Sequence, residues 1–228
     1  MKKICLFSVV GLYFFITGCS AATVVISNDY KNQKITGKNL MVVPLFIQPV
    51  ILNPDDVVDD LGEGVPEEVY MTYFEEKFTD VFMKTKSFNN LSFSIKKPYS
   101  RMSEKVLEIN RAEKMKILLP EENSRLGDSE NQSDFIIFLD NLQVSRKSGS
   151  AGMMIGNIYT GGSAPTLFHK VSFVIWDVEN NKIVSYGRVD DESVVFFAMT
   201  EGNWESVIQG IAYKILRYSP FPIINRNK

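Results

Sequence analysis

The clearest fold signal is the stretch TLFHKVSFVIWDV-ENN-KIVSYGRVDDESVVFF, residues 166–197. Two long runs rich in β-branched and aromatic residues flank three polar residues, which is the composition of two strands joined by a turn. Asn180 and Asn181 tolerate the left-handed backbone that a tight turn needs. We therefore predict a β-hairpin with strands over Thr166–Val178 and Lys182–Phe197.

Two further apolar runs predict core strands on the N-terminal side of this hairpin. Asn39–Leu52 contains MVVPLF at 41–46, where Pro44 implies a strand end, an edge or a bulge. Asp134–Val144 contains FIIFL at 135–139. Leu91–Ile95 alternates apolar and polar residues, so we expect a short, half-buried strand there.

Two segments have the apolar spacing of amphipathic helices. In Pro66–Lys84 the apolar residues recur at steps of three and four, and a proline suits the first helical turn. The last helix is expected to start with Asn203 as its cap. Its apolar face comprises Trp204, Val207, Ile208, Ile211, Ala212 and Ile215. Less regular helical patterns occur at Pro54–Leu61 and Ser103–Leu119.

This order of elements predicts a single α/β (α+β) domain over residues 39–228, with a mixed β-sheet, a β-hairpin in the C-terminal half and amphipathic helices packed on the sheet. Hydrophobic residues make up 45% of the chain and aromatic residues 12%, as is usual for globular proteins. The polar stretch before the domain, Ser20–Lys38, is predicted to be a tether with a short strand at Thr23–Ile26.

The N-terminus has the order of a secretory signal. Lysines at positions 2 and 3 precede an uncharged apolar run, Ile4–Ile16, and the sequence ITGC follows at 16–19. ITGC resembles the lipobox of bacterial lipoproteins. The resemblance implies cleavage before Cys19, a thioether from Cys19 to diacylglycerol, and an acyl chain such as palmitate on its amine. Residues 1–18 would then be the signal peptide, and residues 19–38 the lipidated N-terminus and tether.

An uncleaved membrane helix is the alternative for this segment. No charged residue occurs from Ile4 to Ile26, and such a run is long enough to cross a bilayer. Either arrangement attaches the domain to a membrane.

Charge and cysteine content exclude several classes of function. Without its signal the chain has 23 basic and 27 acidic residues, so it lacks the positive charge that attracts nucleic acid. Its two cysteines are Cys5, within the signal, and Cys19, which lipid would modify. The mature domain therefore has no thiol for catalysis, metal binding or an internal disulfide.

From residue 40 to about 218 the chain resembles envelope lipoproteins whose fold is similar to the N-terminal domain of TolB, including CsgG-like proteins. The resemblance rests on MVVPLF at 41–46, SDFII at 133–137 and VIWDVENNKIV at 174–184, followed by the last amphipathic helix. It implies a non-catalytic assembly or accessory role and transfers no catalytic residue. The chain differs in having Asn181 near the position of a glycine that is usual in that hairpin turn.

No motif in the sequence indicates a catalytic, metal or cofactor site. His169 is the only histidine, and a catalytic triad would need Ser163, Thr166 or another hydroxyl beside it. We expect a surface or pocket-edge position for it. The acidic residues at 55–63 and 190–192 lack the spacing of a calcium loop and are expected to be solvated.

The Gly/Ser-rich stretch 148–165 is expected to be a loop between two strands. It carries Met153, Met154, Ile155 and Tyr159, and flexible methionine-rich surfaces suit protein or membrane contacts. We predict this segment as a contact loop.

Together these features predict a lipid-anchored bacterial envelope protein that acts without catalysis, as an accessory in envelope assembly, transport or secretion. Its expected partners are the bilayer, through acylated Cys19, and an envelope protein. In a bacterium with two membranes, Ser20 stands where some lipoproteins have the aspartate that retains them on the inner membrane, which favours the outer membrane, facing the periplasm. A surface hydrolase acting on glycans and an oligomeric secretion-pore subunit are the alternatives.

Overall fold

The computed structural model describes most of the chain from Thr23 to Ile223. Within this range the residues that it does not describe are 86, 97, 122–123, 125, 127–132, 150–152, 156–157, 161–163 and 196–197. The predicted signal peptide and Cys19 therefore lie outside the described part of the chain.

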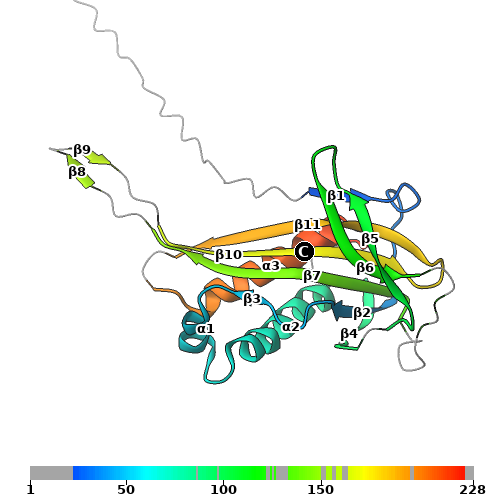
Figure 1. Cartoon of the computed structure of the whole chain (residues 1–228), viewed down its shortest axis with the longest axis horizontal. Helices are drawn as coiled ribbons and strands as arrows, with labels where there is room; N and C mark the ends of the chain where they lie inside the picture. Colours follow the sequence, from blue (N-terminus) through cyan, green and yellow to red (C-terminus); the bar gives the residue numbers. More distant parts are fainter. Residues whose placement is uncertain are drawn as a thin grey trace, which may run out of the picture.

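A seven-stranded mixed sheet forms the centre of the molecule (Figure 1). Its strand order is β1-β11-β10-β7-β2-β4, and the short β3 also pairs with β7. The strands span Thr23–Ile26 (β1), Lys38–Pro44 (β2), Val50–Ile51 (β3), Phe88–Phe93 (β4), Phe135–Lys147 (β7), Thr166–Asp177 (β10) and Lys182–Val194 (β11). β2 runs parallel to both of its neighbours, β4 and β7. The pairs β1 with β11, β11 with β10 and β10 with β7 are antiparallel. The predicted α+β class with a mixed sheet is confirmed.

The predicted hairpin is the middle of this sheet. β10 and β11 pair from Thr166 opposite Val194 to Asp177 opposite Lys182, and β10 pairs on its other side with β7. Asn181 has a φ of 53°, the left-handed conformation expected for the turn. The second strand ends at Val194, before the predicted end at Phe197.

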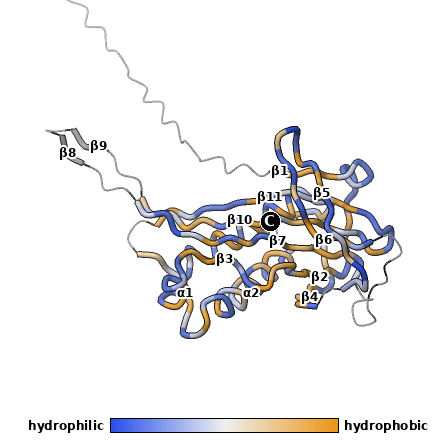
Figure 2. Tube along the Cα trace, viewed as in Figure 1, coloured by the Kyte–Doolittle hydropathy of each residue, from blue (hydrophilic) through white to orange (hydrophobic). Residues whose placement is uncertain are grey.

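Three helices pack on one face of the sheet (Figure 1). They are α1 (Pro54–Leu61), α2 (Pro66–Lys84) and α3 (Glu201–Arg217), and α2 has the predicted bounds. Along α2, the rings of Phe74, Phe78 and Phe82 stack at centroid distances of 5.3 and 4.7 Å. Apolar residues recur along α2 and the neighbouring β2 and β4 (Figure 2). The larger hydrophobic core therefore lies between the helices and the sheet.

The last helix begins earlier than predicted. Thr200 is the cap, and Asn203 lies three residues into the helix, where its Oδ1 accepts a hydrogen bond from the Thr200 backbone N–H at 3.1 Å. The sequence identified a residue of this cap but placed it at the wrong position, because Thr and Asn both satisfy N-terminal groups of helices.

The predicted helix over Ser103–Leu119 is wrong, because this segment forms a two-stranded hairpin on the other face of the sheet. Its strands are β5 (Met102–Glu108) and β6 (Lys114–Pro120), paired antiparallel. Met115, Ile117 and Leu119 are buried, while Lys114, which precedes them, and Lys116 are exposed. This period of two belongs to a strand, and it buries one side of β6 in a second, smaller core with residues of β2, β7 and β10.

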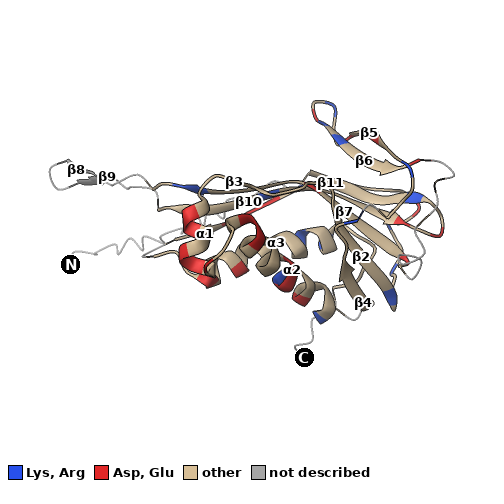
Figure 3. Ribbon diagram, turned by 60° about the horizontal axis from the view of Figure 1, so that its bottom comes forward, with Lys and Arg blue, Asp and Glu red and all other residues tan. Residues whose placement is uncertain are grey.

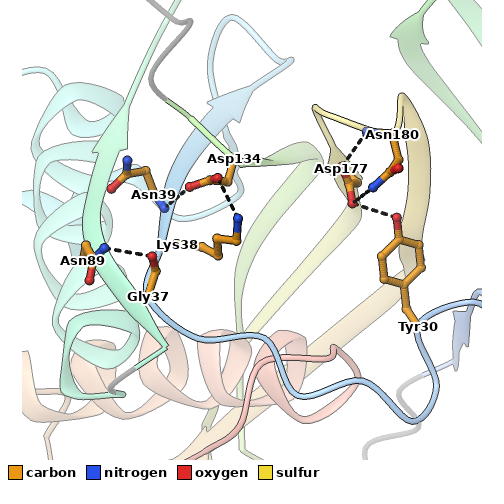
Figure 4. Close-up of polar contacts among 8 residues, drawn as sticks. All are labelled: Tyr30, Gly37, Lys38, Asn39, Asn89, Asp134, Asp177 and Asn180. Carbon is orange, nitrogen blue, oxygen red and sulfur yellow. Dashed lines mark hydrogen bonds and ion pairs between the residues drawn. The ribbon is translucent and has the colours of Figure 1, made fainter.

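Residues 23–38 are part of the folded domain, in contrast to the predicted tether. The short strand expected at Thr23–Ile26 is present as β1 and pairs with β11. Tyr30 is buried, and its hydroxyl donates a 2.7 Å hydrogen bond to Asp177 at the end of β10 (Figure 4). Packing against the sheet thus includes residues from Thr23 onward, ahead of the predicted boundary at residue 39.

Candidate functional site

His169 lies in the core and not at the predicted surface or pocket edge. It is fully buried under α2 and α3, with its ring 5.5 Å from that of Tyr70 and 5.8 Å from that of Trp204. The Tyr70 hydroxyl lies 3.3 Å from Nδ1, and Nε2 has no hydrogen-bond partner among the residues that the structure describes. Desolvation lowers the pKa of His169 to about 3, so the ring is neutral at physiological pH. This environment is that of a packing residue.

Several of the acidic residues that were predicted to be solvated instead form ion pairs or hydrogen bonds with residues of other helices and strands. Asp56 on α1 pairs with Arg146 at 2.9 Å, and Asp60 accepts a 3.0 Å hydrogen bond from the Trp204 indole. Asp191 on β11 pairs with Lys214 on α3 at 2.6 Å. These carboxylates therefore have structural partners, and the sequence alone could not supply those partners because they are distant along the chain.

A polar cluster at one end of the sheet joins the N-terminal segment to the central strands (Figure 4). Asp134 accepts hydrogen bonds from the Asn39 backbone N–H at 2.8 Å and from the Lys38 ammonium at 3.0 Å. The bond to Asp134 raises the pKa of Lys38. Asp177 is buried and accepts from Tyr30 and from the backbone N–H of Asn180. Because these groups satisfy one another's hydrogen-bonding capacity, the cluster fixes strand ends.

The predicted contact loop is only partly described. β8 (Met153–Ile155) and β9 (Ile158–Thr160) pair antiparallel within the connection between β7 and β10. The side chains of Met153, Met154, Ile155 and Tyr159 lie outside the described part of the structure, and so does Cys19.

An apolar pocket at the carboxyl ends of β2 and β4 was not predicted. It has a volume of about 250 Å³. Its lining residues are Pro44, Phe46, Ile47, Gln48, Glu67, Glu68, Met71, Glu75 and Ile95. Ile47 is 100% exposed and Ile95 is 88% exposed. Adjacent exposed apolar side chains at a concave site are typical of a binding surface.

The rim of this pocket is acidic. Glu67 and Glu68 occupy the first turn of α2 and Glu75 lies two turns later, and Figure 3 shows acidic residues gathered on the helices. Desolvation raises the pKa of Glu75, so an approaching cation would stabilise its charged form. The pocket therefore suits a ligand with an apolar body and a positive charge.

Sequence reasoning missed the pocket because it assigned the whole run from 39 to 52 to buried strand. β2 ends at Pro44, Leu45 donates one more backbone hydrogen bond to Leu139 of β7, and the chain then leaves the sheet until β3 starts at Val50. Pro44 was the residue in the sequence that could have indicated this strand end, since proline cannot donate a backbone hydrogen bond to a neighbouring strand.

Two other cavities are more polar. One of about 470 Å³ lies between the β5–β6 hairpin and the β10–β11 turn, lined by Lys105, Leu107, Trp176 and Lys182 among others. Another of about 270 Å³ lies on the sheet face that the hairpin leaves open, and Lys170, Ser172 and Arg188 line it. Neither has fully exposed apolar side chains comparable with Ile47, so the acidic-rimmed pocket is the leading candidate.

Among the residues that the structure describes, no group of three or more His, Cys, Asp or Glu side chains is placed to hold a metal ion. Over the same part of the chain, no helix has the length and apolar character to span a bilayer. Thr23–Ile26, the last part of the uncharged N-terminal run, is a strand of the sheet.

No protein-family model matches the chain, and no curated protein matches its sequence. Among solved structures, the chain is similar to PelC from Paraburkholderia phytofirmans, a dodecamer, with 10% identity and a TM-score of 0.41 over 89% of this chain and 99% of that chain. It is also similar to a minor lipoprotein from Acinetobacter baumannii, with 13% identity and a TM-score of 0.31 over 79% and 90%. A third is a Xanthomonas campestris protein of family DUF330, with 9% identity and a TM-score of 0.36 over 82% and 85%. These similarities assign the chain neither a family nor a function, and its likeness to TolB-like and CsgG-like proteins stays a prediction.

Proposed function

We propose that the protein is a lipid-anchored envelope lipoprotein that acts through protein contacts. The observation that carries the proposal is the N-terminal sequence, in which a basic start and an apolar run lead to Ile16-Thr17-Gly18-Cys19. Two or more acyl chains hold a protein stably on a bilayer, so a lipidated Cys19 would anchor the domain stably. The outer membrane, with the domain in the periplasm, is the proposed location.

The proposed contact site is the acidic-rimmed pocket. Its exposed Ile47 and Ile95 would be buried by a partner, and burial of apolar surface stabilises a complex by about 25 cal/mol per Å² before the costs of association. Glu67, Glu68 and Glu75 would steer and orient that partner. The partner is therefore proposed to be a protein segment with apolar side chains flanked by lysine or arginine.

The predicted contact loop, with Met153, Met154, Ile155 and Tyr159, is proposed as a second contact segment. It is independent of the pocket, since it belongs to the connection between β7 and β10. A deletion can therefore test it separately.

The anchor is tested by Cys19→Ser in the native host. The wild-type protein is expected to incorporate a labelled fatty acid and to enter the detergent phase on Triton X-114 separation. The variant is expected to do neither. A wild-type protein that carries a free thiol at Cys19, or that stays in the aqueous phase, contradicts the proposed anchor.

The contact site is tested by a photo-crosslinking amino acid at Gln48, on the pocket rim, in intact cells. We expect a discrete crosslinked product that Ile47→Asp abolishes, because a buried unpaired charge opposes binding. Val106→Asp is the matched control, since Val106 is 55% exposed on β5, away from the pocket. A product that survives Ile47→Asp, or that both variants abolish equally, contradicts the assignment of the pocket.

A further inference from the structure

The tip of the β5–β6 hairpin contacts the residue of β11 that pairs with the first residue of β1. Thr23 pairs with Arg188 of β11. The Arg188 guanidinium forms an ion pair with Glu113 and donates a 3.4 Å hydrogen bond to the Lys114 carbonyl. The Tyr186 hydroxyl donates a 2.8 Å hydrogen bond to the Glu108 carbonyl, at the other side of the tip. The views in Figures 1 and 3 place this hairpin over the sheet face opposite the helices.

Few residues separate this corner of the molecule from the proposed anchor. Only Ser20, Ala21 and Ala22 lie between Cys19 and Thr23. Four steps along a fully extended chain span at most about 14 Å. The first residue of β1 is therefore held within about 14 Å of the lipidated cysteine, whatever conformation those residues take.

We propose that the bilayer surface is the partner of this corner, so that the start of β1 and the hairpin tip, residues 108–114, rest on the lipid headgroups. The proposal rests on the proposed lipid anchor at Cys19. It commits the domain to one orientation, with the β1–β11 edge of the sheet toward the membrane.

The chemistry of the tip suits the headgroup region and not the hydrocarbon. Its charged residues are Glu108, Arg111, Glu113 and Lys114, two of each sign, and three of these four are exposed. A balanced set of charges gives no strong attraction to anionic lipid, so the tether supplies the binding through a high local concentration. The domain without its lipid is consequently expected not to bind vesicles.

The acidic-rimmed pocket lies at the opposite edge of the sheet. β1 is the first strand in the sheet order, whereas β2 and β4 are the last two. Neighbouring strands are about 4.8 Å apart, so four spacings place β2 about 19 Å from β1 across the sheet. The proposed orientation thus directs Ile47 and Ile95 away from the lipid and toward a partner in the aqueous compartment.

The experiment uses the lipidated protein in phosphatidylcholine vesicles that carry a quencher on the lipid headgroup. Because Cys5 and Cys19 are the only cysteines, a fluorophore can be placed specifically at Ala112→Cys on the tip or at Gln48→Cys on the pocket rim. Both positions are exposed, so they form a matched pair. We expect quenching to be severalfold stronger at position 112 than at position 48. Quenching that is equal at the two positions, or stronger at position 48, overturns the orientation.

A second variant tests the role of the short connection. Insertion of about 20 Gly/Ser residues between Ala22 and Thr23 gives the anchor a reach of about 25 Å, and the difference between the two labels should shrink. If the difference in quenching between positions 112 and 48 stays the same after the insertion, the short tether is not the cause of the orientation. If mass spectrometry instead shows a free thiol at Cys19, the lipid anchor itself fails and the orientation with it. Acylated protein without quenching at position 112 refutes the orientation alone.

Discussion

The burial of His169 predicts a specific loss of stability in acid. In the folded domain its pKa is about 3, against an ordinary value of 6.5, because the ring is fully desolvated among Tyr70 and Trp204. Below pH 6.5 the unfolded chain therefore binds a proton at this residue that the folded chain does not. Stability from this group is fully present above pH 6.5 and is lost as the pH falls toward 3.

The magnitude follows from the shift. Each pH unit between the two pKa values is worth about 1.4 kcal/mol, so from pH 7.5 to pH 5.0 the free energy of unfolding should fall by about 2 kcal/mol through this one group. For an m-value of about 2 kcal/mol/M, this lowers the urea midpoint by about 1 M. Any folded-state pKa below about 4 gives the same loss.

Urea unfolding of wild type and His169→Gln at the two pH values is the assay. Glutamine is close in size, can still accept a hydrogen bond from the Tyr70 hydroxyl and does not titrate. The carboxylates contribute equally to the pH dependence of stability in both proteins, and His169 is the only histidine. The difference between the two proteins in how the free energy of unfolding changes with pH therefore reports this residue alone. Parallel losses of stability in the two proteins would refute the argument that the ring is buried and neutral.

Three further predictions concern local packing and the contact loop. Gly210→Ala on α3 would bring a Cβ into the Asp191 carboxylate and should destabilise by about 1–3 kcal/mol in urea unfolding, whereas Gly202→Ala on the same helix makes only an ordinary van der Waals contact with Thr200 Oγ1 at 3.6 Å and should be neutral or stabilising; equal effects would contradict this packing. Gly187→Ala on β11 would bring its Cβ into the β1 backbone, and hydrogen exchange at the β1 amides should accelerate selectively; unchanged exchange would show that the strands are not so close. Deletion of residues 149–162 should leave the urea midpoint nearly unchanged and reduce partner crosslinking, and if folding and crosslinking both survive, the contact-loop proposal is wrong.

Sequence reasoning succeeded where a structure is set by neighbours along the chain. The bounds of α2 follow from one apolar stripe with a proline at its start, and the β10–β11 hairpin follows from two dense runs around an asparagine turn. It failed for residues 103–119, whose apolar residues fit a helix and a strand almost equally well. The burial of Met115, Ile117 and Leu119 against the sheet decides for the strand, and this burial is a property of the folded structure.

The candidate sites divide in the same way. The signal at Cys19 is a linear motif and needs no fold to be recognised, and it is the basis of the proposed location. His169 was expected near the surface because a strand sequence does not say which of its faces a helix will cover. The pocket at Ile47 and Ile95 arises because two strands that are distant in sequence end side by side, which is a property of pairing and not of either segment.

The amino-acid sequence by itself determined the class of fold, the central hairpin, two of the main helices and the expected lipid attachment, because each depends on residues close together along the chain. Tertiary structure alone decided that β1 joins the sheet, that the β5–β6 segment is a hairpin, that His169 is buried, and that the pocket and the N-terminal corner lie at opposite edges. The physical reason is that burial and strand pairing involve residues far apart in the chain, and only the folded arrangement defines which of them meet.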